Sequence, residues 1–250
     1  MTARPLSVWL LLVTIWLSAG CGSTLPTYPW RGREAAWQQM RRRMEQVRGF
    51  SGQCQLLVKN QGPLPVRLEA AVALRLPDRF RLRAWKGPAP VIDLAGSDRG
   101  LWLWISQEIS KKTALPKSDP DSKRPLGAAH ALWSPLGAPW FGDPATRFED
   151  DGGRTFRLIR STGPDDSAQQ VAEIDRDTLT VRRYTLRAEG RERFTLRFDR
   201  YRQHEQAVWP QRWIFETGDR RMEIHLKTYR FNPSLPEAAF KPARGARRVF

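Results

Sequence analysis

The side chains that could carry acid–base or metal chemistry are few in this sequence and lie far apart. None of its three histidines, His130, His204 and His225, is near another in the chain. No pair of histidines or cysteines has the spacing of a zinc site. Adjacent carboxylates occur at Asp150–Asp151 and Asp165–Asp166, but they stand beside Gly or Pro, where such side chains favour turns by hydrogen-bonding the backbone. These residues predict neither a catalytic centre nor a metal site.

Short motifs for nucleophilic or cofactor chemistry are incomplete. Gly49–Gly52 lacks the last glycine spacing of a nucleophile elbow, G-x-S-x-G. Asp119–Asp121 lacks the later Gly and Glu of a calcium loop, and a solvated turn explains it. Neither a phosphate-binding loop nor a dinucleotide-binding glycine motif occurs. We therefore expect a protein that is not an enzyme and has no cofactor.

Cys21 carries the strongest chemical indication, because it ends an export signal. Arg4 supplies positive charge, and Leu6–Leu17 is almost continuously apolar. A dozen or so apolar residues fall short of the roughly 20 that span a membrane, so residues 1–20 are expected to be a removed signal peptide. The segment resembles the lipobox of bacterial lipoproteins, with Ser18 where that family prefers Leu. The resemblance implies lipid attachment at Cys21 through acyl groups such as palmitate; ordinary cleavage beside an unmodified cysteine is the alternative.

Composition allows a sizeable core and suggests anionic partners. The chain is 40% hydrophobic and 10% aromatic, and its formal net charge is +16. Such a charge favours nucleic acid or anionic lipid, and an exported location argues against nucleic acid. Arginine outnumbers lysine throughout the chain. Selection for binding to lipid headgroups and the codon usage of a GC-rich genome explain this excess about equally well. Besides Cys21 there is only Cys54, so an acylated Cys21 excludes an intramolecular disulfide and leaves Cys54 as a small buried hydrophobe.

The elements after the signal begin with a tether and a helix. Residues 21–32 are rich in Pro and small polar residues and read as a flexible, lipidated tether. From Arg33 to Val47 apolar residues recur at three- and four-residue steps, which predicts an amphipathic helix that ends near Gly49. We expect residues 33–250 to form one domain.

Most of that domain alternates apolar and polar residues, as strands with one solvated face do. Tight turns separate the strands, which favours an antiparallel meander over βαβ units. Ala114–Gly127 is a proline-rich loop, and Ala128–Trp133 is a candidate short helix. The fold class expected is mainly β (α+β), with about ten or eleven strands and two or three helices. The strands are expected at Val66–Leu76, Phe80–Ala84, Val91–Ala95, Leu101–Ile105, Thr155–Arg160, Gln170–Asp175, Leu179–Ala188, Arg193–Tyr201, Val208–Glu216 and Arg221–Phe231.

Large aromatic residues exceed what an ordinary core requires. Each indole is a large apolar body with one hydrogen-bond donor, suited to a cavity for an acyl chain or to a membrane interface. The alternative is that all of them are core residues. The residues expected to line a cavity and its lid are Phe80, Leu82, Trp102, Trp104, Trp133, Trp140, Phe141, Phe194, Leu196, Phe198 and Trp213.

Several short motifs together resemble a known family. They are the lipid-attachment cysteine, the amphipathic helix, Phe50–Gly52 at the entry to the first strand, the alternating hairpin Leu74–Leu82, Arg197–Tyr201 leading to Trp209-Pro210, and the closing Pro233–Pro236 with Phe240–Pro242. The chain resembles the LolA/LolB-like superfamily of periplasmic lipid and lipoprotein carriers. This resemblance implies an open antiparallel half-barrel with helices across its apolar concave face.

The resemblance also implies how such a cavity is gated and placed. The segment around Trp133, Leu136, Trp140 and Phe141 would be a lid, and Trp85–Pro90 is a candidate for the loop that touches the membrane. Gly22 is compatible with sorting to the outer membrane in bacteria that use aspartate there for retention.

The expected function is therefore that of an outer-membrane-anchored lipoprotein facing the periplasm, which binds lipid or lipoprotein acyl chains. Arg79, Arg81 and Arg83 are candidates to meet anionic headgroups at the rim. Donors or partners would be a periplasmic carrier or an envelope transport complex. The alternative is a structural subunit of such a complex, without a transported ligand and with a concavity filled by its own side chains.

Overall fold

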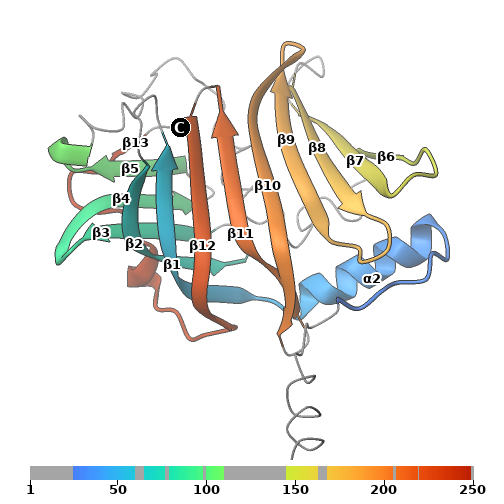
Figure 1. Ribbon diagram of the computed structural model, residues 1–250, viewed down its shortest axis with the longest axis horizontal. Coiled ribbons are helices and arrows are strands. Elements are labelled where there is room, and N and C mark those ends of the chain that lie inside the picture. The colour runs from blue at the N-terminus through green and yellow to red at the C-terminus, as the bar shows by residue number, and fades with distance from the viewer. Residues whose placement is uncertain are drawn as a thin grey trace, which may run out of the picture.

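The computed structural model describes residues 25–59, 65–76, 79–97, 100–109, 145–162, 168–204, 207–218 and 220–248. Thirteen strands form one antiparallel sheet (Figure 1). They are β1 (Gly49–Lys59), β2 (Val66–Arg75), β3 (Arg79–Lys86), β4 (Ala89–Ser97), β5 (Gly100–Ile105), β6 (Thr146–Glu149), β7 (Thr155–Thr162), β8 (Ala168–Asp175), β9 (Val181–Ala188), β10 (Arg191–His204), β11 (Ala207–Thr217), β12 (Arg220–Phe231) and β13 (Arg247–Arg248).

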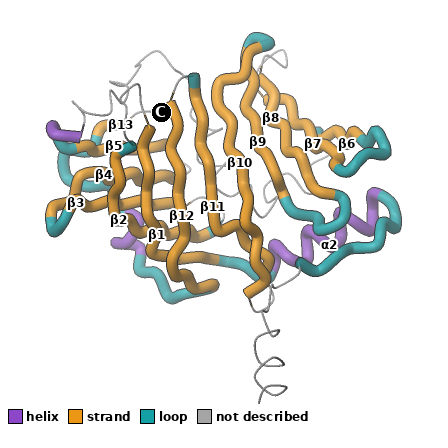
Figure 2. Tube along the Cα trace, viewed as in Figure 1, coloured by secondary structure: helices purple, strands orange, loops and turns teal. Residues whose placement is uncertain are grey.

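Two meanders build this sheet, one from β1 to β5 and the other from β6 to β12. They join where β1 pairs with β12, and the order is β13-β5-β4-β3-β2-β1-β12-β11-β10-β9-β8-β7-β6. The sheet bends so strongly that β3, β4 and β5 run nearly across the direction of β11 and β12 (Figure 2). Because its edge strands β13 and β6 do not pair, it stays an open half-barrel, as expected. Those edge strands are also the shortest, with two and four residues.

The two faces of the sheet differ because apolar and polar residues alternate along each strand. Leu56 of β1 lies opposite Leu68 of β2 and Ile224 of β12, and all three are buried. The adjacent Gln55 lies opposite Glu69 on the other side. We call the face that carries Leu56 the inner face and the face that carries Gln55 the outer face.

The α-helix α2 (Arg33–Glu45) packs against one side of the inner face (Figure 1). Its residues Ala36 and Met40 are almost fully buried in the same core as the inner-face strands. The predicted helix thus exists and ends two residues earlier than expected. The short 3-10 helix η4 (Glu237–Phe240) lies instead on the outer face, where Arg81 Nη1 donates to the carbonyl of Ala239 (3.1 Å).

Part of the predicted tether is docked onto the sheet. The amide of Tyr28 donates to the carbonyl of Asp177 (2.5 Å), and Trp30 packs on Phe148 and Phe156. The guanidinium of Arg176 lies 4.3 Å from the centre of the Trp30 ring. Residues 25–32 therefore belong to the folded domain rather than to a free linker.

Several predicted features fall outside the described residues. They are the signal peptide 1–20, Cys21, the short helix at Ala128–Trp133 and the lid residues Trp133, Leu136, Trp140 and Phe141. No helix within the described residues is both long and apolar enough to cross a membrane.

Candidate functional site

The inner face brings six of the predicted lining residues into one apolar cluster. Phe80 and Leu82 come from β3, and Phe194, Leu196 and Phe198 come from β10. Trp213 of β11 lies directly opposite Phe198, with the rings edge to face at 6.2 Å. All six are buried. Residues from both meanders thus form a continuous apolar surface.

Trp102 and Trp104 do not lie on that surface. Trp104 is opposite Asp93 and Trp102 is opposite Ala95, on the outer face. The neighbouring Leu103 of the same strand points to the inner face instead and packs against the core. The expectation that these two tryptophans share a face with Phe80 is thus corrected by the register of β4 and β5.

Stacked aromatic rings fill one end of the inner face. The rings of Phe50 and Trp209 lie 4.7 Å apart at an interplanar angle of 22°. Tyr229 and Phe231 of β12 pack on Phe50 at 5.7 and 5.8 Å, and Trp213 adjoins Trp209 at 6.0 Å. Trp209 was not among the predicted lining residues, although it stands on the same face as Trp213, four residues along the strand. This end of the half-barrel is closed by the protein's own side chains.

The opposite end carries a row of apolar side chains that are only partly covered. Cross-strand pairing aligns Phe215 with Met222, Met222 with Val58, and Val58 with Val66. Phe194 stacks on Phe215 at 5.3 Å and pairs with Leu186 of β9, which extends the row. The row crosses six adjacent strands, and its members Leu186, Phe215, Met222 and Val66 are half-buried. The alternation along single strands gave no sign that these half-buried residues gather in one row, which we call the apolar rim.

The turn between β8 and β9 holds α2 against this scaffold. Arg43 of α2 donates through Nη1 to the carbonyl of Thr178 (2.7 Å). Asp175 organises the turn, because its Oδ1 accepts from the amide and the hydroxyl of Thr178 at 3.0 and 2.9 Å. Burial by itself would raise the pKa of Asp175, but these hydrogen bonds and the charges of Arg182 and Arg154 outweigh it, so the pKa lies below its ordinary value.

Solved structures with a similar fold include three that cover most of both chains. A candidate outer membrane lipoprotein-sorting protein domain from Vibrio parahaemolyticus has a TM-score of 0.54 at 14% identity, over 82% of this chain and 94% of that one. A DUF1329 family protein from Desulfovibrio piger has a TM-score of 0.55 at 13% identity, over 83% and 96%. A LolA superfamily protein from Nitrosomonas europaea has a TM-score of 0.50 at 11% identity, over 82% and 96%.

The fold is LolA/LolB-like. The predicted fold resemblance is therefore confirmed, and at such low identity the likeness concerns the fold alone. The sequence matches no family model and no curated protein at a significant level.

On the outer face of this LolA-like sheet, single carboxylate side chains each form ion pairs with two arginines. Asp93 is 3% exposed and binds both Arg81 (Nε–Oδ1 3.1 Å, Nη2–Oδ2 2.7 Å) and Arg83 (Nε–Oδ2 2.9 Å). Glu237 of η4 likewise pairs with Arg75 and with Arg79. The predicted rim cations Arg79, Arg81 and Arg83 thus lie on the outer face in ion pairs, not at the edge of the apolar inner face.

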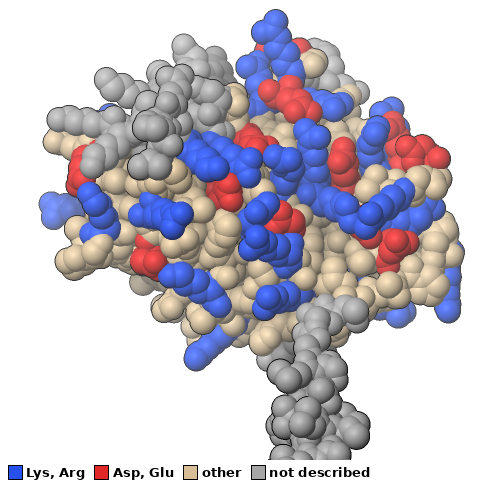
Figure 3. All heavy atoms as spheres, viewed as in Figure 1, with Lys and Arg blue, Asp and Glu red and all other residues tan. Residues whose placement is uncertain are grey.

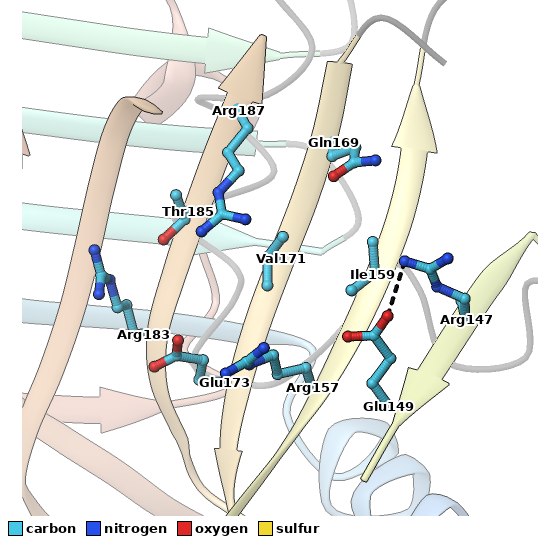
Figure 4. Close-up of a pocket in the computed structure, with 10 residues that line it drawn as sticks. All are labelled: Arg147, Glu149, Arg157, Ile159, Gln169, Val171, Glu173, Arg183, Thr185 and Arg187. Carbon is cyan, nitrogen blue, oxygen red and sulfur yellow. Dashed lines mark ion pairs between the residues drawn. The ribbon is translucent and has the colours of Figure 1, made fainter. Parts of the chain in front are cut away.

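Over β6–β9 the outer face encloses a pocket of about 250 Å³ (Figure 4). Ile159, Val171 and Thr185 form its floor, because they are direct cross-strand neighbours and are buried. Charged side chains surround them, with Arg147 and Glu149 paired at 2.8 Å. The charged members of the lining are Arg147, Glu149, Arg157, Glu173, Arg183 and Arg187. Figure 3 shows the outer face, with Lys and Arg intermingled with Asp and Glu.

Groups suited to catalysis do not converge in the described part of the chain. No cluster of three or more His, Cys, Asp or Glu that could hold a metal occurs within these residues. His225 lies on the outer face, with Nε2 3.0 Å from Oε2 of Glu223. His204 stands against the rings of Tyr229 and Phe231.

Proposed function

We propose that this protein is a lipid-anchored protein of the bacterial envelope that binds acyl chains of lipids or lipoproteins along its inner face. The observation that carries the proposal is the apolar row at one end of the half-barrel, in which Phe194 and Val58 are buried and four members are half-buried: Leu186, Phe215, Met222 and Val66. Partly exposed apolar side chains that adjoin one another in this way are typical of binding surfaces for apolar partners.

Acyl burial would supply the affinity. Each CH₂ group removed from water contributes about 0.8 kcal/mol, so a long chain needs no specific polar contact. The chain would enter over Phe215 and Met222, and the stack of Phe50 on Trp209 would limit how far it reaches. Binding would therefore be selective for length more than for headgroup.

Anchoring would use Cys21, after removal of residues 1–20, and the site would then face the periplasm from the outer membrane. The docked segment 25–32 supports a short link, because only residues 21–24 lie between the proposed lipid and the folded domain. Four residues span at most about 14 Å. The hairpin turn at Gly87-Pro88 is exposed and is our candidate for a contact with the membrane.

Native mass spectrometry of the full chain, extracted in mild detergent, tests the acyl-binding proposal. Wild type should retain co-purified lipid, and Phe215→Asp should lose most of it, because a carboxylate at the rim opposes apolar contact. Val208→Asp is the matched control, since it adds the same charge to the outer face of the same strand. Equal lipid content in Phe215→Asp and wild type would refute acyl binding at this rim.

A further inference from the structure

The largest of the described hollows on the outer face is a groove across β12, β1, β2 and β3. Its volume is about 700 Å³, within the usual range of ligand sites. Cross-strand pairing places Ser51 of β1 between Ala73 of β2 and Arg230 of β12. In the next outer-face row Gln53 lies opposite Ala71 and Thr228. The groove thus lies on the side of the sheet opposite the proposed acyl-binding face.

Small side chains on neighbouring strands create this hollow. The outward side chains of β2 in the groove are Ala71 and Ala73, and both are half-buried. The corresponding position on β1 is Ser51. Elsewhere on the outer face the long side chains of Arg197 and Arg221 cover the strands. A run of small residues among such long neighbours leaves the floor of the groove open.

The C-terminal segment forms a fixed wall of the groove. Ala238 and Ala239 of η4 line it, and Arg81 Nη1 donates to the carbonyl of Ala239 at 3.1 Å. Phe240 is buried beneath Arg75, whose guanidinium lies 5.0 Å from the centre of its ring. Because the wall is tied to β2 and β3 by these contacts, the groove is preformed.

The charge of the lining is positive. Its charged residues are Arg81, Arg83 and Arg230, and none of the described lining residues is a carboxylate. Asp93 neutralises only one of the two guanidinium groups that it binds. Arg230 is exposed and forms no ion pair with another residue that the structure describes. The groove therefore favours an anionic occupant.

We propose that this groove docks an extended, acidic segment of a partner protein. Ser51, Gln53 and Thr228 offer hydroxyl and amide groups along the channel, which a peptide can satisfy by hydrogen bonds. An alkyl chain laid over them would leave these groups without partners, at a cost in free energy. The small floor residues admit a backbone closely, and the arginines meet carboxylates. This inference concerns the outer face and does not depend on acyl binding at the inner face.

Fluorescence anisotropy with a defined probe tests the proposal. The probe is a fluorescein-labelled peptide of ten residues that alternates aspartate and alanine, titrated with the full chain in neutral detergent micelles. Binding should weaken as the salt concentration rises, because salt screens the charges of the groove arginines. A peptide with asparagine in place of aspartate should bind at least about tenfold more weakly, since it lacks the charges that the arginines meet.

Two variants locate the binding site. Ala73→Trp fills the floor of the groove and should abolish peptide binding. Arg230→Glu reverses an exposed charge of the groove and should weaken peptide binding about tenfold. Arg191→Glu is the control, because it makes the same charge change on β10, outside the groove. Thermal unfolding of each variant checks that the fold is intact.

Three outcomes would overturn the proposal: no peptide binding to wild type, equal binding by Arg230→Glu and Arg191→Glu, or equal binding of the asparagine peptide. A parallel titration uses fluorescent phosphatidylglycerol in the same micelles. The groove would be assigned to a lipid headgroup instead if the wild type binds this lipid but not the peptide, and if Arg230→Glu weakens the binding of the lipid. Loss of lipid from Phe215→Asp leaves the peptide result unaffected, so the two proposals fail independently.

Discussion

Phe50 of β1 stacks on Trp209 of β11 across the intervening strand β12, with ring centroids 4.7 Å apart. Both side chains are fully buried. The contact closes one end of the inner face, so the half-barrel has one filled end and one apolar rim. A stack that joins the two meanders also ties together segments that are distant in the chain.

Trp209→Ala should therefore destabilise the whole domain. Removing a buried indole leaves a cavity and costs about 3–5 kcal/mol of unfolding free energy. Urea unfolding followed by circular dichroism measures the change. Trp102→Ala serves as control, because Trp102 is half-buried on the outer face and should cost clearly less. Similar losses in both variants would contradict the assignment of faces.

Asp93→Ala should be among the most damaging substitutions on the outer face. It leaves Arg81, which is 9% exposed, without its bidentate partner. Breaking a buried pair on one side costs about 3–5 kcal/mol, measurable as a shift of the urea midpoint. Replacing both partners by apolar residues, Arg81→Met with Asp93→Leu, should recover much of the loss. Arg83→Gln keeps the buried pair and should change stability by at most about 1 kcal/mol.

Thiol counting should distinguish the two fates of Cys21. Cys54 is fully buried, and burial raises its pKa to about 12, so it should not react with Ellman's reagent in the folded protein. After unfolding in guanidinium, Cys54 should react. If Cys21 is acylated, that is the only thiol titrated; two thiols would show that Cys21 is free.

Acid should weaken the docking of α2 through Asp175. The pKa of this carboxyl is below its ordinary value in the folded state. Its contribution to the free energy of unfolding is therefore complete above the ordinary pKa, about 4. The contribution is lost as pH falls through the lower folded-state pKa. Asp175→Asn should lower the free energy of unfolding at neutral pH and make its decrease below about pH 4 less steep. Urea midpoints measured across that range test this, with the exposed neighbour Asp177→Asn as control.

Period-two alternation predicted most strands because each strand has one buried and one solvated face. The strands β6 and β13 were missed, since four and two residues are too few to show a period. Only pairing with β7 and β5 defines them. Local sequence thus predicts the long strands of the open sheet but not its edges.

The faces of Trp102 and Trp104 could not be read from sequence for a related reason. In β5, Leu101 to Ile105 are all apolar, so large apolar residues lie on both faces of the strand. No alternation then shows which of them lie on the inner face. The register with Asp93 decides it, and that register depends on the turn between β4 and β5. For β10, where Arg197 separates Leu196 from Phe198, the predicted face is the observed inner face.

The brevity of the edge strands has a consequence for self-association. An open sheet exposes unpaired backbone groups at both margins, and such margins can add strands from another molecule and seed aggregates. Here the margins are β13, with two arginines, and β6, with four residues including Arg147. The short length of both strands and the two arginines of β13 discourage edge-to-edge stacking. The protein can thus keep its half-barrel unclosed while neighbouring copies remain separate, even when crowded at high density.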